Sequence, residues 1–171
     1  MIEVIRKALN SQFAAALKML ENAVNDCPSE LWQRRLWNEH EQSPEFAEFW
    51  YIVYHTLFWT DLYLTGRYDS FFPPAPFTLD ELDPAGVLPD REYSREELLD
   101  YLSHCREKLR NLIGALTEER AEEICRLRWG DVSYIELLLD TLRHIQEHTA
   151  QLNLYLGQTR NNPARWVSLD Q

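Results

Sequence analysis

Two histidines of the chain, His144 and His148, have the spacing of a bidentate metal ligand. On a helix, residues four apart share one face, with Cβ atoms about 6 Å apart. Neutral imidazole suits divalent transition metals, and a helix holds two rings in a fixed mutual orientation. The pair therefore predicts half of a metal site and needs a third ligand from another part of the chain.

A third histidine, His55, lies in a strongly apolar segment between Ile52 and Phe58. An unpaired imidazole there would be costly to remove from water. His144 and His148 also share their face with apolar residues, so all three histidines are expected to point inward and to form one site. Two explanations without a metal stay open: the four-residue spacing can arise by chance, and a buried histidine is usually hydrogen bonded to a neighbouring side chain.

Three further residues are candidates for the wall of a pocket beside this site. Tyr51 and Trp59 lie one helical turn to either side of His55, and Gln151 lies one turn beyond His148. Ordinary core packing, or a solvated polar position, is the alternative for each. Three protein ligands would leave at least one coordination position open, which is typical of catalytic metal sites.

Glu147 completes the pattern H-x-x-E-H, in which a glutamate serves as general base in one class of metallopeptidases. Those enzymes take a third ligand from a distant downstream carboxylate, and only a short tail follows His148 here. We therefore expect Glu147 to face solvent or to lie behind the ligands. His40, in a polar run, and His104, without a partner at ligand spacing, are not expected in the site.

Apolar residues recur at three- and four-residue steps along most of the chain and predict four amphipathic helices. Their expected ranges are about 2–25, 44–64, 94–116 and 133–157. Ser43 before Pro44 predicts the start of the second helix, and capping boxes at 94–97 and 133–136 predict the starts of the third and fourth. Gly66 and Gly157 are expected to end the second and fourth helices.

Between the second and third helices, residues 66–93 lose the helical period and contain five of the eight prolines. We expect a long loop that can cross the bundle or cover a site, pinned to the core by Phe71, Phe72 and Phe77. Residues 117–127 are expected to form a short acidic helical turn, and no segment predicts a strand of comparable quality. The prediction is an all-α four-helix bundle in a single domain, 1–171, with about 158–171 as a C-terminal tail.

Composition limits the classes of partner. The 171 residues contain 17 Lys and Arg against 28 Asp and Glu, a formal net charge of -11 that opposes approach to nucleic acid. No apolar run is long enough to span a bilayer, and the first residues lack the pattern of a signal peptide. Cys27, Cys105 and Cys125 are odd in number and widely separated, which favours free thiols in a reducing compartment. We therefore expect a cytoplasmic protein with no nucleic-acid or membrane partner.

The sequence resembles the DinB-like superfamily over nearly its whole length. The resemblance rests on residues 54–64 followed by Gly66, with His55 in the middle of that helix, on the H-x-x-x-H of His144 and His148, and on Leu-Tyr-Leu-Gly at 154–157. It implies a four-helix bundle with up-down-down-up topology, often a homodimer. It also implies one divalent ion, nickel, zinc or iron, bound by His55, His144 and His148.

Relatives in this superfamily include S-transferases that use bacillithiol or mycothiol. The resemblance therefore implies a metal-dependent enzyme acting on a small molecule, a transferase with a low-molecular-weight thiol as cofactor or a hydrolase. The alternative is a non-catalytic module in which the metal or the bundle surface serves ligand sensing or assembly. Although the superfamily takes its name from DNA damage, DNA binding is not implied.

Overall fold

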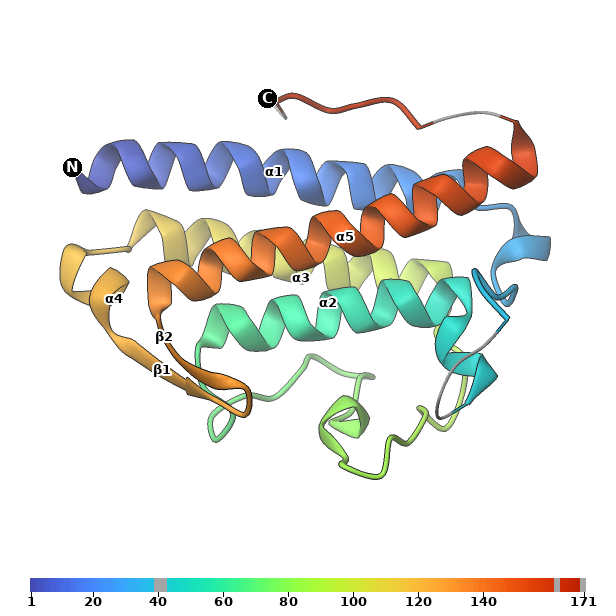
Figure 1. Cartoon of the computed structure of the whole chain (residues 1–171), viewed down its shortest axis with the longest axis horizontal. Coiled ribbons are helices and arrows are strands. Elements are labelled where there is room, and N and C mark those ends of the chain that lie inside the picture. The colour runs from blue at the N-terminus through green and yellow to red at the C-terminus, as the bar shows by residue number, and fades with distance from the viewer. Residues whose placement is uncertain (39–42, 162–163, 170–171) are drawn as a thin grey trace.

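The computed structural model describes residues 1–38, 43–161 and 164–169 and is dominated by four long helices packed side by side (Figure 1). These are α1 (Ile2–Asp26), α2 (Phe49–Thr65), α3 (Arg95–Gly114) and α5 (Tyr134–Arg160). Each packs against two others, since α2 and α1 both contact α3 and α5. The predicted helical class is therefore confirmed.

The directions of the helices follow from Figure 1, where α1 and α5 run from left to right and α2 and α3 from right to left. Contacts between the helix ends agree with these directions. Tyr134, at the start of α5, donates its hydroxyl to the carbonyl of Leu64 at the end of α2 (2.8 Å). Arg6 of α1 donates to the carbonyl of Leu116, just beyond α3 (2.6 Å). Because α2 and α3 are parallel neighbours, residues 66–94 must return along the bundle before α3 begins.

One apolar cluster fills the space between the helices. The predicted stripe of α1 is confirmed, with Leu9, Phe13, Leu17, Leu20 and Val24 buried. α2 is different, because most of its residues are buried on all sides. A helix that is apolar all round lies inside a protein rather than on its surface. His55 therefore lies on a helix that is buried along most of its length.

Two predicted helix boundaries are wrong. Ser43 and Pro44 begin a 3-10 helix, η2 (Pro44–Ala47), and α2 starts only at Phe49, after Glu48 in an extended conformation. The cause is pairing with the connector after α1: the amide of Phe49 donates to the carbonyl of Arg34 (3.0 Å). Gly157 does not end α5, which continues to Arg160 and stops at Asn161 in the left-handed conformation.

The signals for the other helix ends are confirmed. Ser94 and Glu97 form the expected capping box of α3, and Ser133 accepts a hydrogen bond from the amide of Glu136 at the start of α5. Gly66 ends α2 with φ +79, and a Cβ there would lie 3.1 Å from the Arg120 guanidinium. The backbone conformation favours glycine at this position, and a Cβ would also lie in tight contact with its neighbours.

The short helical turn expected after Thr117 is present, but it ends at Glu122 and not near Leu127, because a β-hairpin follows. α4 (Glu118–Glu122) is followed by β1 (Ile124–Leu127), which pairs antiparallel with β2 (Gly130–Ser133). Cys125 and Leu127 are buried and Ile124 is exposed, the alternation that a strand with one covered face requires. Each strand has only four residues, so the alternation of buried and exposed positions is too brief to be recognised in the sequence between two helical segments.

The loop between α2 and α3 is held at several points, as predicted, but not by all three phenylalanines. Phe71 and Phe77 are buried, whereas Phe72 is 76% exposed, so the prediction for Phe72 is wrong. A 3-10 turn, η3 (Asp80–Leu82), lies in the middle of the loop. Arg128, at the tip of the hairpin, donates to the carbonyl of Leu82 with both terminal nitrogens (3.1 and 3.2 Å). The hairpin therefore fixes the turn against the bundle.

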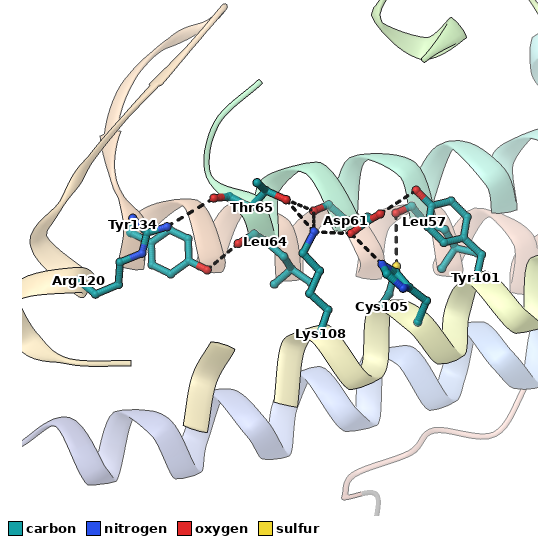
Figure 2. A network of polar contacts seen from close by, with 10 residues as sticks. Leu57, Asp61, Leu64, Thr65, Tyr101, Cys105, Lys108, Arg120 and Tyr134 are labelled. Carbon is teal, nitrogen blue, oxygen red and sulfur yellow. Dashed lines mark hydrogen bonds and ion pairs between the residues drawn. The ribbon is translucent and has the colours of Figure 1, made fainter. Parts of the chain in front are cut away.

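On the side of α2 that faces α3, a buried polar network joins the two helices (Figure 2). The Asp61 carboxylate is fully buried and accepts hydrogen bonds from the Lys108 ammonium (2.5 Å) and the Tyr101 hydroxyl (3.2 Å). Lys108 also donates to the hydroxyl of Thr65 (2.6 Å).

None of the described helices is long and apolar enough to cross a membrane.

Candidate metal centre

The structure brings the three predicted histidines together where α2 packs against α5. One ring nitrogen from each of His55, His144 and His148 can be chosen such that all three lie within 4.8 Å of one another. The Nε2 atoms of His55 and His144 are 3.3 Å apart. The inward orientation expected from the sequence is therefore observed, and all three side chains are partly buried.

Two of these rings have their outer nitrogen bound to an oxygen. His55 Nδ1 lies 3.0 Å from Oε2 of Glu81, and His148 Nδ1 lies 2.8 Å from Oε1 of Gln151. A carboxylate or an amide oxygen can only accept, so each Nδ1 holds a proton, and in the neutral form of either ring Nε2 is bare. Histidines that bind metals are oriented in this way, with the outer N–H given to a carboxylate or carbonyl.

The third ring, His144, lacks such a partner, since its buried Nδ1 makes no hydrogen bond within the described part of the chain. Its Nε2 faces the bare Nε2 of His55. In one tautomer His144 Nε2–H donates to His55 Nε2; in the other, Nδ1 of His144 holds the proton and both Nε2 atoms are free to bind a cation. The donor set therefore fits a divalent ion of the kind that prefers imidazole nitrogen.

Burial keeps the rings of His144 and His148 neutral at ordinary pH, because it lowers the pKa of each. Removal from water, together with the nearby His55 and His148, lowers the pKa of His144 to about 2. Burial is also the main reason that the pKa of His148 is lowered, with His55 adding to the effect. A metal must displace any proton from its ligands, so imidazoles that are already neutral bind without that competition at ordinary pH.

Glu81 is a residue of the site that sequence reasoning missed. It comes from η3, its side chain is only 5% exposed, and besides His55 it accepts hydrogen bonds from the Tyr51 hydroxyl and from Nε1 of Trp59 (2.7 Å). Burial alone would raise the pKa of this carboxyl, but the adjacent His55 and the hydrogen bonds of its three partners lower it. The sequence of the proline-rich loop has no periodic pattern that would indicate a contact between Glu81 and His55. From the sequence one could expect only that a buried imidazole has some hydrogen-bond acceptor.

A cavity of about 330 Å³ opens beside the histidines. His55, His148 and two of the predicted pocket residues, Tyr51 and Gln151, line it. Trp59, the third predicted pocket residue, contributes through its hydrogen bond to Glu81 instead. A small molecule in this cavity would lie next to two of the three possible metal ligands.

The other polar residues considered from the sequence were Glu147, His104, His40 and the three cysteines. Glu147 is exposed, as expected for a residue that is not a general base in this site. His104 lies 3.4 Å from the Asp61 carboxylate in the network between α2 and α3, and His40 lies outside the described residues. Cys27, Cys105 and Cys125 are buried free thiols. Of these residues, none that the structure describes belongs to the histidine cluster.

Comparison with models of known protein families matches the DinB superfamily over residues 12–152. No curated protein and no solved structure gives a significant match. The matched segment covers most of the chain and includes all three clustered histidines. The chain therefore belongs to the DinB superfamily.

Proposed function

We propose that the protein binds one divalent transition-metal ion through Nε2 of His55, His144 and His148. The observation that supports this most directly is the convergence of three imidazoles, two of which have their Nδ1 protons directed away from the cluster. The superfamily is associated with metals, which points the same way. Nickel, zinc and iron all accept this donor set.

We propose further that the site is enzymatic and acts on a small molecule in the adjoining cavity, as a thiol S-transferase or a hydrolase. A bound divalent ion would supply Lewis acidity that favours the thiolate or hydroxide form of a nucleophile. In the transfer reaction, the sulfur of a low-molecular-weight thiol forms a bond to an electrophilic carbon, and the leaving group departs with its electron pair. The chain itself contributes the cavity and the fixed orientation of His55 and His148.

The thiol in this scheme comes from outside the chain. The three cysteines are buried, and burial raises the pKa of Cys27 to about 12 and that of Cys105 well above its ordinary value. Such thiols are poor nucleophiles because the thiolate is the reactive form.

Metal analysis of the purified protein, followed by assays with a panel of thiols and electrophiles, tests the proposal. We expect about one equivalent of metal and turnover that His148→Ala abolishes while the circular dichroism spectrum is unchanged. Glu147→Gln, on the same helix but exposed, is the matched control and should retain both metal and turnover. Metal binding without turnover would favour the non-catalytic module, and absence of metal binding would refute the site.

Three further properties are proposed: the dimer and the bundle topology follow the superfamily resemblance, and the cytoplasmic location follows the cysteine usage and composition of the sequence. We propose that the protein works in the cytoplasm as a homodimer, with the up-down-down-up bundle as its protomer. Sedimentation equilibrium of the full chain distinguishes a dimer from a monomer of 20.3 kDa.

A further inference from the structure

We propose that Glu81 is the positioning residue of the metal centre, and that through it metal occupancy is linked to the packing of the loop over residues 66–94. This inference rests on the proposed metal site. It concerns a residue that lies outside the four helices and acts on the site through His55 rather than as a ligand.

The hydrogen bonds of Glu81 define this role. Oε1 accepts from the Tyr51 hydroxyl, and Oε2 accepts from His55 Nδ1 (3.0 Å) and Trp59 Nε1 (2.7 Å). Both oxygens are thus occupied by donors from three consecutive turns of α2. Glu81 could turn toward a metal only by giving up these bonds, so its effect must pass through the imidazole that it holds.

This contact fixes which nitrogen of His55 can bind a metal. With Nδ1–H donated to the carboxylate, the bare nitrogen is Nε2, the atom that faces His144. The negative charge of the acceptor also increases the electron-donating power of the ring. Gln151 orients His148 in the same manner but without charge, and His144 Nδ1 has no partner among the described residues. Of the three ligands, His55 is therefore the one that depends on a charged partner.

The location of Glu81 connects this ligand to the loop. η3 is held from one side by α2, through Tyr51 and Trp59, and from the other by the hairpin, through Arg128 and the carbonyl of Leu82. If a packed η3 favours metal binding by orienting His55, then a bound metal must favour the packed η3 by the same free energy, because linkage is reciprocal. The loop that borders the cavity is thus more ordered in the metal-bound protein.

Two measurements on the full chain test this, with Co²⁺ as the probe. Competition against a chromophoric chelator gives the affinity, and hydrogen–deuterium exchange gives the protection of residues 78–84 with and without Co²⁺. In the wild type we expect Co²⁺ to increase this protection. Glu81→Ala should weaken Co²⁺ binding about 10- to 100-fold, the range for lost partners of ligands. At saturating Co²⁺ it should lack the metal-dependent protection.

Matched variants keep the test decisive. Glu81→Gln retains an acceptor without the charge and should bind Co²⁺ with intermediate affinity, which a purely structural role would not produce. Asp80→Asn, in the same turn but hydrogen bonded to Thr78, should bind like the wild type. If Glu81→Ala does not fold, the Glu81→Gln affinity and exchange data decide alone.

The outcomes separate this inference from the proposed function. A wild type that does not bind Co²⁺ would refute the metal site itself. Two results would overturn only the role of Glu81, provided that the wild type binds Co²⁺. One is that Glu81→Gln and Glu81→Ala both bind Co²⁺ as tightly as the wild type. The other is that the exchange protection of residues 78–84 is the same with and without Co²⁺.

Discussion

The Nε2 atoms of His55 and His144 face each other at 3.3 Å although the two residues are 89 positions apart in the chain. The packing of α2 against α5 brings them together, and the proton on His55 Nδ1 is held by Glu81 on the far side of the ring. Folding alone therefore places the Nε2 of His55 against the Nε2 of His144, close enough for a proton of His144 or a cation to lie between them. A cation that takes the place between these nitrogens binds to a site that is already formed, so binding needs little further ordering of the chain.

Metal addition should accordingly stabilise the fold. A ligand that binds only the native state at a thousand times its dissociation constant raises the free energy of unfolding by about 4 kcal/mol. We expect chelator-treated protein to melt at a higher temperature on addition of Zn²⁺ or Ni²⁺. His144→Ala should melt at the same temperature with or without metal, and an equal shift in this variant would show that the metal binds elsewhere.

Without metal, the stability of the protein should fall as the pH drops below about 6.5. The pKa of His144 is lowered to about 2 in the folded state, and that of His148 is also lowered. Below pH 6.5 the unfolded chain therefore binds protons that the folded chain does not, which favours unfolding. Each such histidine contributes up to about 1.4 kcal/mol per pH unit.

Urea unfolding of metal-free protein between pH 7 and pH 5, above the range where most carboxylates titrate, measures this slope. The matched variant is His144→Leu, which should have a smaller slope by about one proton. Equal slopes in the two proteins would show that the buried His144 is not responsible for the loss of stability.

The pair formed by Asp61 and Lys108 predicts a large effect on stability away from the metal centre. The carboxylate is fully buried, and Lys108 is its closest cation at 2.5 Å (Figure 2). Removing one partner of a buried pair leaves an uncompensated charge, so Lys108→Met should lower the free energy of unfolding by about 3 kcal/mol. Asp61→Asn in the same chain should recover part of this loss.

The control for this prediction is Lys18→Met, because Lys18 pairs with Glu21 at the surface with a side chain that is 40% exposed. Exposed pairs contribute about 1 kcal/mol or less. Denaturant unfolding measures all these variants, and similar losses for Lys18→Met and Lys108→Met would contradict the importance of burial.

The histidine cluster and the four long helices could be predicted from the sequence because both depend on helical periodicity. The stripe of α1 and the spacing of His144 and His148 need only a helix to be correct. The inward direction of His55 followed from its apolar neighbours. In each case local sequence and tertiary packing favour the same answer.

The parts that could not be predicted depend on contacts between distant segments. Glu81 lies in a loop without periodicity, and nothing local shows that its turn returns to α2. α2 starts later than predicted because the backbone amide of Phe49 donates to the carbonyl of Arg34. The helix-start signal at Ser43 does not reveal this contact between distant segments. The hairpin was missed because its strands are only four residues long.

The hairpin should influence the loop through Arg128. Both terminal nitrogens of this side chain donate to the carbonyl of Leu82, next to Glu81. Arg128→Ala should therefore increase the hydrogen exchange of residues 78–84 several-fold, while the exchange of α1 stays unchanged. Arg126→Ala, an exposed arginine of the same hairpin, is the control and should leave the loop as it is. Equal effects of the two variants would show that Arg128 does not restrain the turn.

The cysteines offer a direct check on where the reactive thiol comes from. Cys27, Cys105 and Cys125 are all buried, and burial is the main reason that the pKa of each thiol is raised. We expect a thiol-specific reagent at pH 7.5 to modify native protein much more slowly than a free thiol, and to titrate all three cysteines once the chain is unfolded in guanidinium.

A variant with all three cysteines replaced by alanine or valine should then retain whatever transferase activity the wild type has with an added thiol. Fast modification of one cysteine in the native protein, together with loss of activity when that residue is replaced, would instead identify a nucleophile within the chain. In that case no external thiol would be needed for the reaction.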